Sequence, residues 1–115
     1  MTLITIKKRS EFERSNKFSK IIYTPNFIIQ KLESNNNGNV PHFGFTITKK
    51  IGSAIVRNKI KRRLKSIIRE LLKYKAKYFD LSFNYILICK KEIVKVSYND
   101  LENELMDKFK SNRVS

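Results

Sequence analysis

Residues 43–70 read FGFTITKKIGSAIVRNKIKRRLKSIIRE, and this stretch decides the fold. In its first part, residues 43–48, large apolar and small polar residues alternate, as in a strand with one buried face. The buried face consists of Phe43, Phe45 and Ile47. The other face consists of Gly44, Thr46 and Thr48. This second face is small and polar, so it leaves room for another molecule to lie across the sheet.

The second part predicts a long helix from about Ser53 to Lys73, with Ser53 as the N-cap and Gly52 in the turn before it. At 100° per residue, five apolar side chains fall within an arc of about 80°. They are Val56, Ile60, Leu64, Ile67 and Leu71. Such a stripe predicts that this helix packs against a sheet.

Beside the stripe, one flank of the same helix is almost purely cationic. It consists of Arg57, Asn58, Lys61, Arg62, Lys65 and Arg69, whereas Lys59 and Arg63 lie on the other side. Like charges four residues apart repel, and a helix shaped for solubility would mix signs. Phosphates against the flank would offset this cost, which favours nucleic-acid binding. Two alternatives stay open: a merely solvated face, and a helix on a membrane surface, which the neighbouring strands disfavour.

The remaining elements are shorter. Residues 7–17 predict a polar helix, and residues 18–23, 27–32 and 83–89 predict strands. Thr24-Pro25-Asn26 has turn chemistry, and residues 33–41 predict a loop. A last amphipathic helix begins at Ser97 and carries Leu101, Leu105 and Phe109 on one side. No repeat or linker divides the chain, so we expect a single α+β domain over residues 1–115.

The chain has 115 residues and a net charge of +15, from 25 Lys and Arg against 10 Asp and Glu. Such an excess is typical of proteins with a polyanionic partner, and nucleic acid is the first candidate. The 41% hydrophobic content argues against disorder. No apolar run approaches the roughly 20 residues that span a bilayer, and residues 1–7 lack a signal-peptide pattern. We therefore expect a cytoplasmic protein.

The sequence offers little for catalysis. One cysteine, Cys89, and one histidine, His42, cannot form a zinc site or a disulfide, and the apolar run around Cys89 predicts a core residue. No Ser/His/Asp or Cys/His arrangement is present, and the carboxylates are too scattered to predict a two-Mg²⁺ site. We expect no catalytic and no metal-ligating residue in the protein.

Residues 43–70 also resemble the signature of the bacterial ribonuclease P protein component. That signature is a strand ending in Lys-Lys, then a Gly, then a helix that opens with Arg-Asn-Arg, continues Ile-Lys-Arg and ends in Arg-Glu. In this chain it reads Lys49-Lys50, Gly52, Arg57-Asn58-Lys59, Ile60-Lys61-Arg62 and Arg69-Glu70. A weaker resemblance, which includes Phe12 and Phe27, covers nearly the whole chain. Lys59 stands where the family signature has Arg, and Lys65 where relatives often have Arg, so the charge is kept without the bidentate fork. Asn16 stands where relatives can carry a second aromatic.

The resemblance implies a fold and a role. The fold is an α/β sandwich like the second domain of ribosomal protein S5, with a mostly antiparallel sheet and a left-handed β-α-β crossover, against the usual right-handed rule. The RNA subunit is the catalyst in this family, and Mg²⁺ is bound mainly by that RNA. The protein binds the catalytic RNA and the 5′ leader of precursor tRNA, and so assists endonucleolytic removal of the leader to give the mature 5′ end.

Two candidate sites follow. The residues expected to bind the catalytic RNA are Lys49, Lys50, Arg57, Asn58, Lys59, Lys61, Arg62, Lys65 and Arg69. The residues expected to line the leader cleft are Phe12, Asn16, Ile28, Gln30, Thr46 and Thr48. Phe12 has a second interpretation, as a core residue that anchors the first helix. Two other functions stay open: a ribosome-associated RNA-binding protein without an enzyme role, and a protein-only nuclease.

Overall fold

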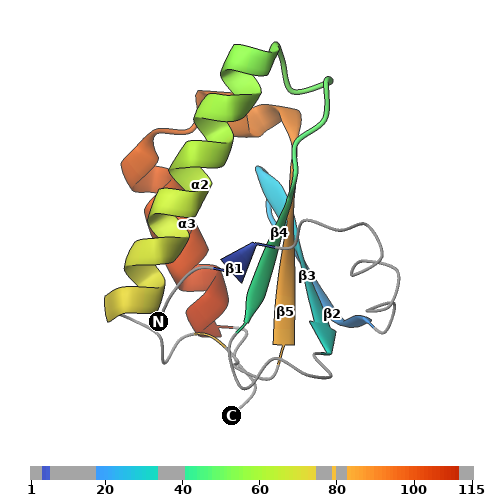
Figure 1. Cartoon of the computed structure of the whole chain (residues 1–115), viewed down its shortest axis with the longest axis vertical. Coiled ribbons are helices and arrows are strands. Elements are labelled where there is room, and N and C mark those ends of the chain that lie inside the picture. Colours follow the sequence, from blue (N-terminus) through green and yellow to red (C-terminus); the bar gives the residue numbers. More distant parts are fainter. Residues whose placement is uncertain (1–3, 6–17, 34–40, 75–78, 80–82, 112–115) are drawn as a thin grey trace.

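The computed structural model describes residues 4–5, 18–33, 41–74, 79 and 83–111 (Figure 1). The described elements are β1 (Ile4–Thr5), β2 (Phe18–Tyr23), β3 (Phe27–Glu33), β4 (His42–Thr46), α2 (Ala54–Tyr74), β5 (Phe83–Cys89), the 3₁₀ helix η2 (Lys91–Lys95) and α3 (Tyr98–Ser111). The helix predicted at residues 7–17 lies outside the described residues. Strand β2 begins directly after this range, at Phe18. Most of the loop predicted at residues 33–41 lies outside them too.

The strands form one sheet in the order β1-β4-β5-β3-β2. Pairing is antiparallel between β2 and β3 and between β3 and β5, as expected, but parallel between β1 and β4 and between β4 and β5, so the sheet is mixed. The β4-α2-β5 segment is the expected β-α-β unit, and its left-handed sense stays a prediction. Figure 1 shows α2 and α3 side by side on one side of the sheet.

The core lies between these two helices and the sheet. All five residues of the predicted stripe of α2 contribute to it, four of them buried and Val56 packed at its margin. Ile68 and Leu72 are buried as well, so the apolar face of α2 is wider than the stripe. An aromatic group fills the centre, where the rings of Phe79 and Phe109 are 4.6 Å apart. The expected core residues of α3 are buried against it.

Both described α-helices begin at the predicted serine. The Ser53 carbonyl accepts a hydrogen bond from the Arg57 N–H at 2.9 Å, and its hydroxyl accepts one from the Val56 N–H at 3.4 Å. The Ser97 hydroxyl accepts a hydrogen bond from the Asp100 N–H at 3.2 Å. These contacts satisfy backbone donors that the first turn of a helix leaves unpaired.

The end of β4 corrects one prediction. The alternating pattern predicted a strand to Thr48, but β4 ends at Thr46. The Thr48 carbonyl accepts a hydrogen bond from the Ile51 N–H at 3.0 Å, so the chain already turns there. Gly52 completes the turn with φ +155°, and a Cβ at this position would lie 3.2 Å from the Val56 side chain. The tight approach to α2 therefore ends the strand early.

Candidate nucleic-acid interface

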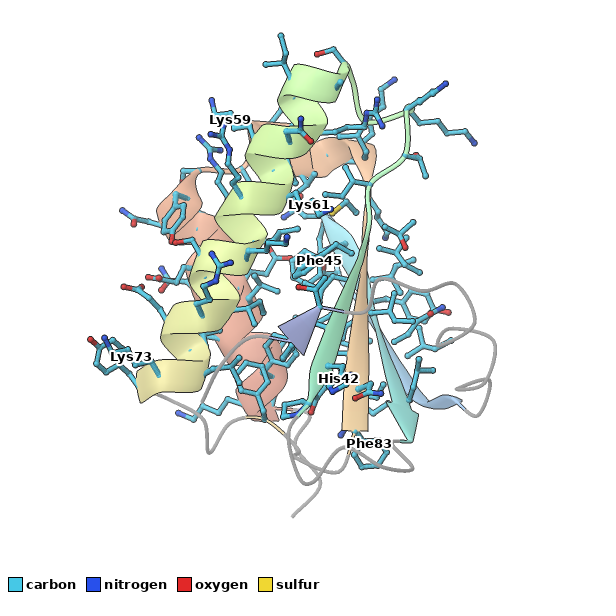
Figure 2. All side chains as sticks on the ribbon, in the orientation of Figure 1. His42, Phe45, Lys59, Lys61, Lys73 and Phe83 are labelled. Atoms are coloured by element: carbon cyan, nitrogen blue, oxygen red, sulfur yellow. The ribbon has the colours of Figure 1, made fainter. Side chains whose placement is uncertain are left out.

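The cationic flank of α2 is exposed along one side of the helix. We call this surface the basic flank, and it consists of Arg57, Asn58, Lys61, Arg62, Lys65 and Arg69. Four of the six side chains are exposed, and Arg57 and Lys65 are half-buried. Figure 2 shows Lys61 on the side of α2 nearer the sheet and Lys59 on the opposite side, as the helical pattern predicts. A shallow depression runs along the flank and includes Ile55 beside the cations.

Four cations of the basic flank have no acidic partner within the described part of the chain. Arg57, Lys61, Arg62 and Arg69 form no ion pair there, and the Nε atom of Arg57 is buried without a hydrogen-bond partner. A buried donor without an acceptor costs about 1–3 kcal/mol, more when it is charged. The Arg57 side chain as a whole is only half-buried, so an external phosphate could supply the counter-charge.

Glu70, the only acid of α2, does not neutralise the basic flank. Glu70 is a neighbour of Glu102 of α3, and burial together with this neighbouring carboxyl group raises the pKa of Glu102 above its ordinary value. Two carboxyl groups that share a site repel each other, so this pair is not arranged to neutralise the cations of α2. Lys49 and Lys50 are exposed in the turn between β4 and α2 and extend the cationic surface beyond the helix.

A second surface lies on the other side of the sheet. The strand register places Thr46, Ile88, Ile28 and Tyr23 in one row across β4, β5, β3 and β2. A parallel row contains Gly44, Ile86, Gln30 and Ile21. The residues that alternate with these rows, such as Phe43, Leu87 and Ile29, are in the core below α2 and α3. Both rows therefore point away from the helices.

Exposure varies strongly along this surface. Tyr23 is 67% exposed and Ile21 38%, whereas Leu32 and Asn84, farther along the same side, are only 1% and 8% exposed. We call the accessible part the open face, and it consists of Ile21, Tyr23, Ile28, Gln30, Thr46 and Ile88. All six side chains are uncharged. Such a surface cannot hold a folded RNA by counter-charge, but it suits an extended single strand, which binds by shape and stacking.

The predicted leader residues divide into three groups. Ile28, Gln30 and Thr46 lie together on the open face, as predicted. Thr48 does not, because it lies beyond the end of β4, exposed in the turn. Phe12 and Asn16 lie outside the described residues.

Sequence reasoning missed three members of the open face, Ile21, Tyr23 and Ile88. The alternation within residues 18–23 carried a signal, because Ile21 and Tyr23 are two residues apart and bracket the buried Ile22. What the sequence did not reveal is the register that aligns Tyr23 with Ile28, and Ile28 with Ile88.

Within the described residues, no three His, Cys, Asp or Glu side chains gather to hold a metal ion. Cys89 is buried, as predicted, and burial raises its thiol pKa to about 12, so it stays a protonated core residue at neutral pH. No helix among the described residues is both long and apolar enough to cross a membrane.

Comparison with known proteins agrees with this geometry. A sequence model of the family Ribonuclease P matches residues 2–112. The chain belongs to this family. It is 32% identical over 107 residues to the ribonuclease P protein component of Bacillus mycoides, covering 91% of this chain and 87% of the relative. It is 34% identical over 101 residues to that of Erythrobacter litoralis, covering 88% and 78%.

The fold of the ribonuclease P protein is shared as well. The structure of the Staphylococcus aureus RNase P protein superposes with a TM-score of 0.76 at 26% identity, covering 98% of each chain. The family confirms the predicted class of function: an RNA-binding protein of tRNA processing, within an endoribonuclease complex. The roles of individual residues rest on the two surfaces described above.

Proposed function

We propose that this chain is the non-catalytic protein subunit of a ribonuclease P ribonucleoprotein, acting in the bacterial cytoplasm. In this proposal the basic flank binds the catalytic RNA and the open face binds the single-stranded 5′ leader of precursor tRNA. The observation that supports it most is the contrast between the two surfaces: one is densely cationic, the other uncharged, and the sheet and core separate them.

The basic flank suits a structured RNA. Arg57, Lys61 and Lys65 repeat every four residues, so their side chains follow one line along α2 and can meet successive phosphates. Arg57 has the additional feature that its buried Nε lacks a partner. Asn58, exposed between the cations, has both a donor and an acceptor for sugar and phosphate groups. Lys49, Lys50 and Lys59 would add contacts on either side.

The open face suits the leader. Its uncharged side chains offer apolar contact and one aromatic ring, and Gln30 offers a polar group for a base edge. Because the side chain of Thr46 is small and partly exposed, the backbone of an RNA strand can approach the sheet closely at the end of β4. Leader and catalytic RNA would thus bind different sides of the molecule and need not compete.

The chemistry is assigned to the RNA subunit, with Mg²⁺ bound mainly by that RNA. In this proposal the protein positions the substrate. Its contribution is binding: contact with the leader favours precursor over mature tRNA, and counter-charge reduces repulsion between the two RNAs.

Reconstitution tests this function. Purified protein, a bacterial ribonuclease P RNA, and both together are each incubated with precursor tRNA at low Mg²⁺. We expect cleavage to a 5′-phosphorylated mature end only when both are present, and no cleavage by protein alone at any Mg²⁺ concentration. Cleavage by RNA-free protein would show a protein-only nuclease instead. Binding to whole ribosomal subunits without any stimulation of the RNA would indicate a ribosome-associated protein.

A further inference from the structure

The outer strand β2 carries the most exposed aromatic side chain of the described sheet. Tyr23 is 67% exposed, although it belongs to a regular ladder and is the register partner of Ile28. An exposed aromatic on a sheet forgoes the burial that usually stabilises such a residue. Its neighbour on the same side of β2, Ile21, is 38% exposed. The open face thus presents apolar surface to solvent at its outer edge, on β2.

We propose that Tyr23 is a base-stacking platform that extends the leader site to the edge of the sheet. This inference rests on the proposed function, because it assumes that the leader crosses the open face at Thr46. The row from Thr46 through Ile88 and Ile28 to Tyr23 crosses three strand spacings. At about 4.8 Å each this is roughly 14 Å, the length of about four nucleotides stacked at 3.4 Å.

The backbone around Tyr23 is rigid, as a stacking platform requires. The hydroxyl of Thr24 accepts hydrogen bonds from the backbone N–H groups of Asn26 and Phe27 and donates one to the Phe27 carbonyl at 2.7 Å. The turn is also tied to the helical layer, because the Asn26 amide donates to Glu104 at 2.8 Å. Tyr23 therefore projects from a fixed strand end, and little conformational entropy is lost when a base stacks on its ring.

A cation lies beside the same strand end. The ammonium group of Lys90 donates a hydrogen bond to the Thr24 carbonyl at 2.8 Å, which holds its charge next to the residue that follows Tyr23. Lys90 is only half-buried, so its positive charge lies near the surface at this strand end. An aromatic ring beside a positive charge is the combination that binds single-stranded nucleic acid without strong sequence preference.

The chain supplies a matched control. Tyr74, at the end of α2, is also 67% exposed, but it belongs to the helical layer, and its ring is 5.2 Å from the Lys73 ammonium. Both tyrosines can therefore be changed with a similar loss of exposed surface. Tyr23→Ala removes the ring, Tyr23→Phe keeps it without the hydroxyl, and Tyr74→Ala removes an equally exposed ring elsewhere.

The experiment titrates reconstituted holoenzyme against precursor tRNAs whose leaders are lengthened one nucleotide at a time. Tyr23→Ala should bind precursor tRNAs with the shortest leaders as tightly as the unchanged protein does. It should bind those with the longest leaders about five- to tenfold more weakly, which is at the low end of the affinity loss for one stacked base. Tyr23→Phe should restore binding, and Tyr74→Ala should have no length-dependent effect. A uniform loss across all leaders, or no loss at any length, would overturn the proposal.

Thr46→Trp, measured in parallel, tests the leader site itself separately from its extension to Tyr23. If it weakens leader binding while Tyr23→Ala does not, the leader crosses the open face but does not reach Tyr23, and only the extension is wrong. If neither variant affects any leader, the leader site itself is wrong. Sedimentation of each free protein completes the test: self-association that Tyr23→Ala abolishes, without a change in leader binding, would assign β2 to contact between copies instead.

Discussion

The basic flank of α2 and the open face of the sheet present opposite kinds of side chain to solvent. The flank carries five cations in four turns of helix, without an ion pair for Arg57, Lys61, Arg62 or Arg69 in the described part of the chain. The open face carries none. In the proposed function, RNA binding by the basic flank would depend on salt, whereas leader binding by the open face would depend on fit and stacking. The two binding events would therefore respond to different substitutions and conditions.

The largest expected effect is on the basic flank. Replacing both Arg57 and Lys61 with Ala should weaken binding to the catalytic RNA by about tenfold or more at physiological salt, because two phosphate contacts are lost. The slope of log K against log salt should fall by roughly 1.5, since each contact contributes about 0.7–0.9. Filter binding over a range of salt concentrations measures both quantities.

The control for this variant removes two charges from another helix. Lys108→Ala with Lys110→Ala on α3 lowers the net charge by the same amount but leaves the flank intact. If it reduces the slope as much as the Arg57 and Lys61 changes, binding reflects overall charge. In that event the basic flank is only a solvated surface.

A smaller effect, on stability, is expected at the turn that joins the two regions. Gly52 has φ +155°, and a Cβ would lie 3.2 Å from Val56, so Gly52→Ala strains the backbone where β4 leads into α2. We expect a loss of about 1–2 kcal/mol in unfolding free energy, seen as a melting temperature lower by roughly 5–10 °C. Calorimetry measures it, and an unchanged melting temperature would show that the turn relaxes freely.

The smallest effect is expected away from both surfaces, at Glu102. Burial and the adjacent Glu70 raise the pKa of Glu102 in the folded state, so its ionised form is disfavoured by folding. The penalty is present above the folded-state pKa and disappears as pH falls below the unfolded value. Glu102→Gln should therefore slightly stabilise the protein at neutral pH but not in acid, without changing affinity for either RNA.

Chemical denaturation at several pH values follows this difference. Glu92→Gln, which removes the same charge from η2, is the comparison. An equal gain from both variants would mean that the effect comes from net charge, and a gain that persists in acid would contradict the assigned cause.

Much of this organisation could be predicted from local pattern. The period of the apolar residues predicted both ends of α2 to within one residue. The N-cap at Ser53 and the start of the last helix at Ser97 were also expected. Strands β2 and β5 have the predicted bounds, because β-rich runs between turn residues depend on nearby sequence alone. The flank was evident too, since charges four residues apart on a helix lie on one side whatever the fold.

Features that depend on distant residues could not be predicted. Ile68 and Leu72 are buried because α3 packs beside α2, where Ser66 and Tyr98 share a hydrogen bond of 2.9 Å. Neither helix specifies this neighbour by itself. The position of Tyr23 at the end of the open row follows from the register of three strands, which the sequence pattern of any single strand leaves undetermined.

The most direct test of the central claim places bulk on the open face and leaves the flank unchanged. Holoenzyme carrying Thr46→Trp is titrated against precursor tRNA with a leader and against mature tRNA, with Thr46→Val as the size-matched control and circular dichroism to confirm folding. We predict normal assembly with the catalytic RNA, about tenfold weaker binding of precursor tRNA, and little change for mature tRNA. Equal loss for both tRNAs, or loss for neither, would contradict the division of roles between the two surfaces.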